Sequence, residues 1–293
     1  MLSWPRKSLR TSDVGTLVRR TITGAFIVVL VLGGLWLHPV SFFLVGAVML
    51  AGTQNEYYKM VRSTGIRPQL VTGIITGFLV YFISTMVAMG WLPKASFMAL
   101  IPVLSIVMVI ELFRKAERPF DSLAHTFFSI LYTAVPISMF PFAAFGHTGL
   151  SPVIRMEGIE FSPGILIGFF LLLWSNDTGA YLAGSAFGRH RLMERISPKK
   201  SWEGFFGGMI LTLAVARLMS GWLGVADTRG WMIIALIITV AGTLGDLIES
   251  MLKRSLGFKD SGSIMPGHGG FLDRFDSVVV AFPMVYLYIA LFG

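Results

Sequence analysis

Residues 230–251 read GWMIIALIITVAGTLGDLIESM. From Gly230 to Gly245 the stretch holds no charged residue, and two acids, Asp246 and Glu249, follow near its end. A helix that crosses the roughly 30 Å hydrocarbon layer of a bilayer needs about 20 mostly apolar residues. The stretch therefore predicts a transmembrane helix that carries carboxylates close to one membrane surface.

Apolar runs of this kind fill most of the chain. Of its 293 residues 54% are hydrophobic and 14% are charged, whereas a soluble domain usually carries about 25% charged residues. Backbone groups that face lipid must be satisfied within their own segment, which favours helices. We therefore expect an all-α, polytopic transmembrane helical bundle. Its nine spans are predicted near residues 21–38, 40–58, 70–92, 95–113, 123–146, 163–187, 204–224, 230–251 and 276–292.

The domain organisation follows from the same runs. A basic segment at residues 1–20 precedes a single integral membrane domain at 21–293. Kinks are expected at four prolines inside the runs, because proline removes a helical hydrogen bond; these are Pro102, Pro136, Pro141 and Pro283. The chain has no cysteine, which excludes a disulfide framework, a thiolate zinc site and a cysteine nucleophile.

The distribution of Lys and Arg predicts the orientation. Nine spans with a cytoplasmic N-terminus place 20 of the 24 basic residues in inner segments, while the outer loops hold only Lys94, Arg155 and Arg229. This asymmetry matches the positive-inside rule. The net charge of +8 therefore indicates loops that face membrane lipids and an anionic substrate, and no nucleic-acid partner is expected.

Carboxylates gather in the C-terminal half, where an acid inside the membrane costs about 2.5–3.5 kcal/mol on insertion scales. Asp246 and Glu249 share a helical face with Lys253, and Asp273 and Asp276 are again three residues apart. Each acid alone could form a structural ion pair, for example with Arg217. A cluster of oxygen ligands without cysteine suits Mg²⁺, and Mg²⁺ suits a phosphate-bearing substrate.

Two basic loops accompany these acids. Lys199 and Lys200 precede Ser201, a plausible N-cap, and a helix N-terminus is a natural anion site. The second loop holds Lys253, Arg254 and Lys259, followed by glycines around His268. For the loop that holds Lys199 and Lys200, an ordinary positive-inside loop is the alternative reading. His268 could act as a general acid or base, donate a hydrogen bond to a phosphate, or form a hydrogen bond within the loop. Phosphoryl transfer needs little general-base help, which favours the hydrogen bond to a phosphate. Glu56 and Glu111 are expected to be structural.

The second loop and its flanks resemble the signature of the phosphatidate cytidylyltransferases, also called CDP-diacylglycerol synthases. That signature runs S-x-x-K-R-x-x-x-x-K-D-x-G and then H-G-G-x-x-D-R-x-D, and here it extends from Ser250 to Asp276. Met265 occupies a position where the family usually has Leu, Ile or Phe. The stretches 174–181 and 197–204 are similar to the same family, and the resemblance covers residues 165–290, the expected catalytic part.

The resemblance implies a Mg²⁺-dependent reaction of CTP with phosphatidate that yields CDP-diacylglycerol and pyrophosphate. It implies metal binding and catalysis by Asp246, Asp273 and Asp276, with His268 as a further catalytic residue. Substrate binding is implied for Lys199, Lys200, Ser201, Lys253, Arg254, Lys259 and Asp177, of which Asp177 is also a weaker candidate for metal binding. A second, monovalent cation and a homodimer are left open. The expected location is the bacterial cytoplasmic membrane, with the active site facing the cytoplasm.

Two other functions are compatible with parts of this pattern. A CTP-dependent lipid kinase of the dolichol-kinase type shares an element like that formed by Asp177, Ala180 and Gly184, but lacks the His-Gly-Gly to Asp-Arg-x-Asp segment. A transporter could use buried acids as a cation path, but would more often show repeated or half-length segments. The lipid product formed from CTP and phosphatidate distinguishes the three.

Overall fold

A computed structural model describes residues 24, 28–145, 154–156, 159–221, 226–259, 261–262 and 269–292. The basic segment 1–20 and His268 lie outside these residues. The long helices are α2 (Pro39–Ser63), α3 (Leu70–Ala88), α4 (Leu100–Phe113), α8 (Gly164–Phe187), α9 (Trp202–Met219), α10 (Thr228–Ser255) and α11 (Leu272–Phe292).

Shorter elements complete the architecture. The turn η1 (Lys94–Ala99) leads into α4, and a nearly continuous helical path comprises α5 (Pro119–Ser129), η2 (Ile130–Ala134), α6 (Val135–Ile137) and α7 (Phe140–Phe145). Two small antiparallel hairpins pair β1 (Ile154–Met156) with β2 (Ile159–Phe161) and β3 (Arg191–Met193) with β4 (Ser197–Ser201). Their registers align Arg155 with Glu160 and Arg191 with Ser201. The predicted helical bundle is confirmed.

Seven helices among the described residues are long and apolar enough to cross a membrane. They correspond to the last seven predicted spans, from 70–92 onward. The predicted span at 40–58 forms α2, which is long enough but carries Glu56, Lys59 and Arg62 in its last turns. The described part of the first predicted span is the short helix Val28–Leu37. The count of nine spans thus stays a prediction.

Local sequence explains where the helices begin and bend. Asp227 caps α10 by accepting a hydrogen bond from the Gly230 amide at 2.7 Å, and Ser201 caps α9 in the same way. Of the predicted kink sites, Pro136 directly follows the π-helical turn η2, and Pro283 lies inside α11. Pro102 sits in the first turn of α4, where a missing N–H is tolerated.

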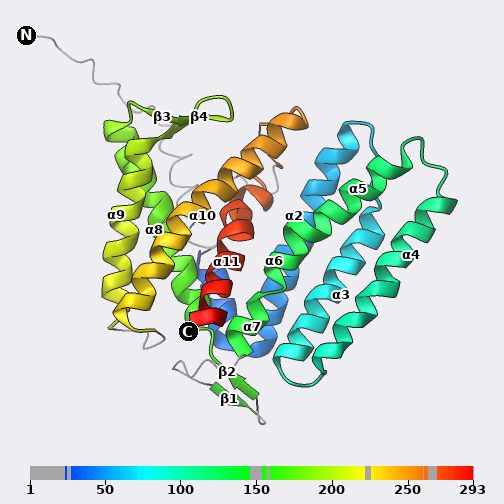
Figure 1. Cartoon of the computed structure of the whole chain (residues 1–293), viewed down its shortest axis with the longest axis horizontal. Helices are drawn as coiled ribbons and strands as arrows, with labels where there is room; N and C mark the ends of the chain where they lie inside the picture. The colour runs from blue at the N-terminus through cyan, green and yellow to red at the C-terminus, as the bar shows by residue number, and fades with distance from the viewer. Residues whose placement is uncertain are drawn as a thin grey trace, which may run out of the picture.

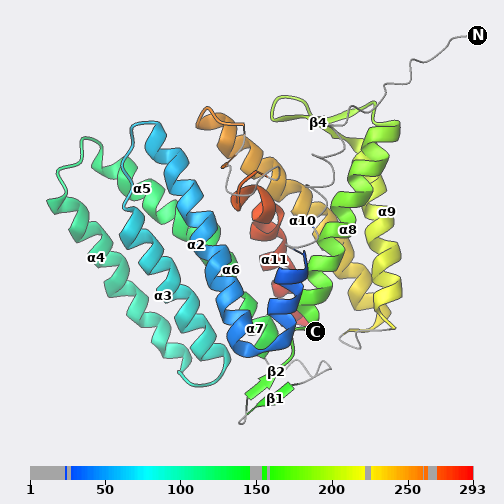
Figure 2. The ribbon, with the colours of Figure 1, turned by 180° about the vertical axis from the view of Figure 1, so that it is seen from behind.

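The helices form two groups around a central layer (Figure 1). Helices α8, α9 and α10 lie on one side, α3 and α4 lie on the other, and α11 lies between them with α2 and α5–α7. The view from behind shows the same order (Figure 2). The hairpin β3–β4 lies at the end of the bundle where α9 and α11 begin and α8 and α10 finish, and β1–β2 lies at the opposite end.

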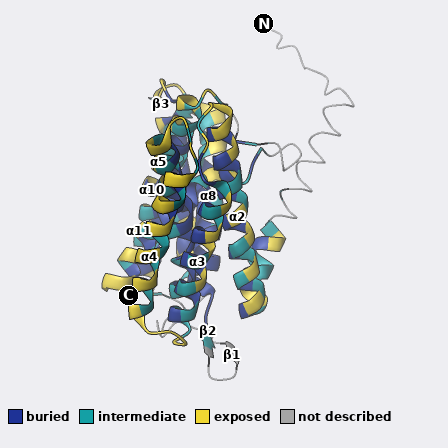
Figure 3. Cartoon of the chain, turned by 90° about the vertical axis from the view of Figure 1, so that its right-hand side faces the viewer, coloured by how far each residue is buried: buried dark blue, intermediate teal, exposed yellow. Residues whose placement is uncertain are grey.

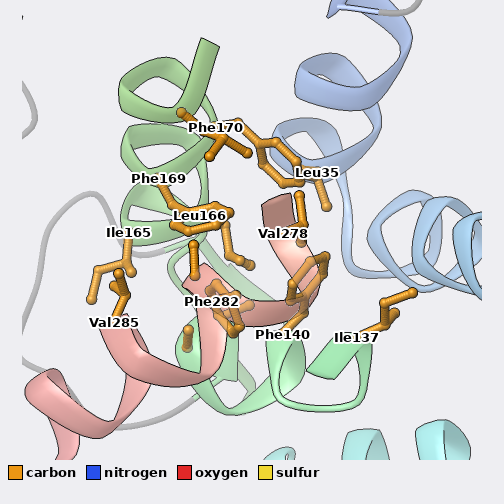
Figure 4. Packing of buried hydrophobic residues seen from close by; sticks show 14 of the residues in the cluster. Leu35, Ile137, Phe140, Ile165, Leu166, Phe169, Phe170, Val278, Phe282 and Val285 are labelled. Carbon is orange, nitrogen blue, oxygen red and sulfur yellow. The ribbon is translucent and has the colours of Figure 1, made fainter. Parts of the chain in front are cut away.

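Aromatic side chains fill the centre of the bundle (Figure 4). Phe282 of α11 meets Phe140 edge-on with ring centroids 4.6 Å apart, and Phe169 of α8 with centroids 5.1 Å apart. Edge-to-face pairs add to the gain from burying the rings. Large apolar side chains such as Leu112 and Phe113 remain on the outside, and the exposed residues cover the outer surfaces (Figure 3). This is the pattern expected when lipid covers the exterior.

Candidate active site

The predicted site residues come together at the end of the bundle that carries β3–β4. A cavity of about 370 Å³ opens there between α8, α9, α10 and α11. Four predicted acids line it, namely Asp177, Asp246, Asp273 and Asp276, together with Lys199, Lys200 and Ser201. Residues far apart in the sequence therefore share one polar cavity at the end of an apolar bundle.

Three carboxylates form its acidic centre. Asp246, Glu249 and Asp276 each offer an oxygen within 4.8 Å of the others. Asp246 and Glu249 are one turn apart on α10, and Asp276 comes from the first turns of α11. Glu249 is 1% exposed, and its Oε1 has no hydrogen-bond partner among the described residues. An unsatisfied buried carboxylate oxygen in an oxygen-rich cluster fits a Mg²⁺ site.

Asp273 lies in the same cavity but has different partners. Its Oδ1 is 2.6 Å from the Lys253 ammonium, and its Oδ2 accepts a hydrogen bond from the Gly270 amide at 2.9 Å. The Ser261 amide also donates to this carboxylate. Lys253 in turn lies 2.5 Å from Glu249. Lys253 thus joins Asp273 to the three-acid centre, while Asp273 also holds the loop that precedes α11.

The basic side of the cavity is built around the start of α9. The Lys200 ammonium lies 2.5 Å from Asp246, so one charge of the acidic centre is already paired. The Ser201 hydroxyl accepts from the Gly204 amide at 3.1 Å, as predicted for an N-cap. Glu203 accepts from the Arg189 and His190 amides and lies 2.6 Å from the His190 ring. These contacts fasten the β3–β4 hairpin to the first turn of α9.

Glu56 has the structural role expected for it. Its Oε2 accepts hydrogen bonds from the Ser261 hydroxyl at 3.1 Å and from the Leu272 amide at 2.9 Å. It therefore satisfies a free N–H at the start of α11. A side chain at Gly270 would collide with this carboxylate, which explains a glycine at that place. Glu111, also expected to be structural, accepts from Gln69 and from Arg114, each at 2.7 Å.

The remaining predicted residues do not line the cavity in the described structure. The Arg254 guanidinium donates to the Phe258 carbonyl at 3.4 Å, and Lys259 is exposed. Conversely, Asn176 and Arg274 line the cavity without having been assigned a role, and Glu249 was grouped with the acids but not assigned to metal. Arg274 could have been assigned to the site from its position inside the D-R-x-D segment of the signature.

Comparison with known proteins agrees with this geometry. A profile of the "Cytidylyltransferase family" matches residues 18–292. The chain belongs to this family. The resemblance inferred from residues 250–276 is therefore confirmed, and the family match extends well beyond the predicted catalytic part, into the helices of the N-terminal half.

Relatives from staphylococci carry a more specific name. The chain is 32% identical to the phosphatidate cytidylyltransferase of Staphylococcus epidermidis over 262 residues, which cover 89% of this chain and 92% of the relative. The corresponding protein of Staphylococcus haemolyticus is 30% identical over the same shares of both chains. That of Staphylococcus aureus is 36% identical over 197 residues, 67% of this chain and 70% of the relative.

Proposed function

We propose that the chain transfers the cytidylyl group of CTP to phosphatidate. An oxygen of the phosphatidate phosphate forms a bond to the α-phosphorus of CTP, and the bond between that phosphorus and the bridging oxygen to the β-phosphate breaks. Pyrophosphate leaves, and CDP-diacylglycerol remains in the membrane. The observation that carries the proposal is the cavity at the end of a membrane bundle, where Asp246 and Asp276 of the acidic centre meet Lys199 and Lys200.

The acidic centre would hold the metal ion. Asp246, Glu249 and Asp276 are the ligands that we propose for Mg²⁺, with Asp273 as a further candidate beside Lys253. When bound, the ion supplies positive charge that bridges and neutralises phosphate oxygens. The fit rests on oxygen donors alone, one of them buried and without a partner among the described residues.

The basic residues would bind and orient the two phosphate groups. Lys199, Lys200 and Ser201, which lead into α9, line the cavity, where the two ammonium groups suit the triphosphate of CTP. Lys200 would exchange its contact with Asp246 for a phosphate once metal charge is present. Arg274 also lines the cavity, and its planar guanidinium suits bidentate contact with a phosphate. We place the catalytic part at residues 165–290, which contain α8 to α11.

The site would face the cytoplasm. Helix ends on the side of β3–β4 carry Arg62, Arg114, Lys200 and Lys253, whereas the turn at the opposite end carries Lys94. This asymmetry supports an inner location for the cavity by the positive-inside rule. CTP is soluble and phosphatidate is held in the bilayer, so a cavity at the cytoplasmic surface gives both substrates access. The bacterial relatives support the cytoplasmic membrane as the location.

A labelled-product assay tests this function. Purified protein in phosphatidate-containing micelles receives CTP labelled in the cytidine or, separately, in the γ-phosphate, with and without Mg²⁺. Cytidylyl transfer places only the cytidine label in the lipid fraction, and only when Mg²⁺ is present. Transfer of the γ-phosphate label to a lipid acceptor would instead identify a kinase, and an unlabelled lipid fraction would contradict both enzymes.

A further inference from the structure

Tyr132 is a buried phenol for which the reaction scheme has not accounted. Its side chain is 8% exposed, and its hydroxyl has no hydrogen-bond partner among the described residues. Leaving a buried hydroxyl unpaired costs about 1–3 kcal/mol. The phenol packs in one buried cluster with Leu272 and Val279, which lie about one turn before and after Asp276 on α11. A buried donor without a partner, one helical turn from the acidic centre, therefore calls for a ligand atom.

The backbone around Tyr132 is unusual. Residues Ile130–Ala134 form a π-helical turn between α5 and α6. Such turns are rare and occur frequently at functional sites, because the extra residue redirects neighbouring side chains. The turn is followed by Pro136 in α6. The π-helical turn and the proline therefore both lie next to Tyr132, where the backbone departs from a regular α-helix.

A groove of about 310 Å³ runs past this residue. Leu131 and Tyr132 line one wall, Ile248 of α10 contributes to it, and Val280 and Met284 of α11 line the other wall. Tyr132 supplies the only polar side chain among the described residues that line it. Leu131 is 66% exposed and Met284 is 50% exposed. The groove is therefore open to the lipid-covered exterior at one end.

The groove and the acidic centre lie within one turn of each other along α10 and α11. Ile248 precedes Glu249 on α10, and Val280 lies one turn after Asp276 on α11. Helices α10 and α11 thus each carry a carboxylate of the acidic centre and, within one turn, an apolar residue that lines the groove. A molecule with a phosphate and long hydrocarbon chains could reach from the acids into the groove without leaving the surface of α11.

We propose that this groove holds the glycerol and the upper acyl chain of the lipid substrate while its phosphate reaches the acidic centre. Tyr132 is the polar contact, whose hydroxyl donates a hydrogen bond to an ester or phosphate oxygen of the lipid. Two observations favour this occupant: the groove and the acids lie within one turn of each other on α10 and α11, and Tyr132 carries the single hydroxyl among the described side chains that line the groove. The inference rests on the proposed function, since it names the subsite of the lipid substrate.

Kinetics of three variants test the subsite. Tyr132→Phe removes only the hydroxyl and should lower kcat/KM for phosphatidate about tenfold, with the KM for CTP unchanged. Met284→Trp narrows the groove and should raise the KM for phosphatidate. Ile75→Trp places the same bulk on an exposed position of α3 that does not line the groove, and should leave both constants unchanged. Equal phosphatidate constants in wild type, Tyr132→Phe and Met284→Trp would overturn the proposal.

A binding readout on the unmodified protein separates this inference from the function itself. Phosphatidate that carries a photoactivatable group in the acyl chain near the glycerol is crosslinked in micelles, and the labelled peptides are identified by mass spectrometry. Label should fall on residues 128–136 or 279–284 and be displaced by phosphatidate but not by phosphatidylcholine. Displacement by both lipids alike, or label elsewhere, would overturn the groove while normal CDP-diacylglycerol formation left the proposed function standing.

Discussion

At the scale of single residues, the site depends on how charges are shared among neighbours. Lys200 is paired with Asp246, and Lys253 is paired with both Glu249 and Asp273. Two cations therefore compensate a cluster of acids that would be costly inside a membrane without partners. The arrangement leaves Asp276 and one oxygen of Glu249 without a cationic contact among the described residues. Those oxygens are the ones most suited to a divalent ion.

Neutral replacements of the three acids test this reading. Asp246→Asn, Glu249→Gln and Asp276→Asn should each lower kcat at least about 100-fold, equal to about 2.7 kcal/mol of transition-state stabilisation. Each should also weaken Mg²⁺ binding measured by titration calorimetry. Asp121→Asn is the matched control, because that exposed acid pairs with Arg118 outside the cavity. Two acid variants with near-normal turnover would show that the metal lies elsewhere.

The variant Asp273→Asn distinguishes two roles of its carboxylate. As a loop anchor, it accepts from the Ser261 and Gly270 amides and compensates Lys253. Breaking such a buried pair commonly costs about 3–5 kcal/mol, so the melting temperature should fall along with activity. Unchanged melting with weakened Mg²⁺ binding would instead identify Asp273 as a metal ligand, as its place in the sequence signature suggests.

At the scale of elements, the cavity depends on where helices begin and how closely they pack. Ser201 and Asp227 cap α9 and α10 with the same geometry, but only Ser201 lines the cavity. Helices α8 and α9 approach each other through glycines, and a side chain at Gly207 would collide with Ala183. The start of α9 and its close contact with α8 thus both fix the position of the side of the cavity that holds Lys199 and Lys200.

The two caps provide a matched pair of variants. Ser201→Ala and Asp227→Ala should each lower stability by about 1 kcal/mol, because each leaves an amide at a helix N-terminus unsatisfied. Only Ser201→Ala should also raise the KM for CTP, since Ser201 lines the proposed triphosphate site and Asp227 does not. Thermal unfolding and steady-state kinetics measure the two effects. A similar KM for CTP in both variants would remove Ser201 from the nucleotide site.

Gly207→Ala tests the contact between α8 and α9. The added methyl would push the helices apart at the cavity, and overpacking of this kind costs about 1–3 kcal/mol. Melting temperature and turnover should both fall. Gly33→Ala is the control, because no atom lies within 4 Å of a side chain added there. A variant Gly207→Ala that melts and turns over like the wild type would show that the helices tolerate a wider separation.

At the scale of the whole molecule, the helices run between two ends of different charge. The cavity, the β3–β4 hairpin and most basic helix ends share one end, and the turn between α3 and α4 lies at the other (Figure 1). Exposed residues lie on the outer faces of the helices (Figure 3), and many of them are large and apolar. This division predicts that the cavity end faces the cytoplasm.

The absence of cysteine makes that orientation directly measurable. Cysteine is placed at Ser197 in the hairpin or at Ala95 in the turn before α4, and intact cells receive a membrane-impermeant thiol reagent. Ala95→Cys should be labelled from outside, and Ser197→Cys only after the cells are opened. The reverse pattern would invert the proposed topology and place the cavity away from cytoplasmic CTP.

Much of this architecture could be predicted from local sequence. Apolar runs of about 20 residues predict spanning helices because a lipid-facing backbone must satisfy itself. Ser201 could be predicted as an N-cap because capping depends on a few neighbouring residues. The signature from Ser250 to Asp276 indicated the family. Asp246, Asp276, Lys199 and Lys200 were predicted as site residues from the acid cluster, the basic loop and the family resemblance, and all four line the cavity.

The choice of partners among those residues was decided by tertiary structure. Helical spacing groups Asp246 with Glu249, but only the packing of α10 on α11 brings Asp276 to both and directs Lys253 to Asp273. Glu56 reaches the start of α11 from α2, across 216 positions of sequence. Tyr132 packs on Leu272 and Val279 of α11 from another part of the sequence. Such contacts depend on how helices that are far apart in the sequence pack against each other. The hydrophobic periodicity of a single segment does not specify that packing.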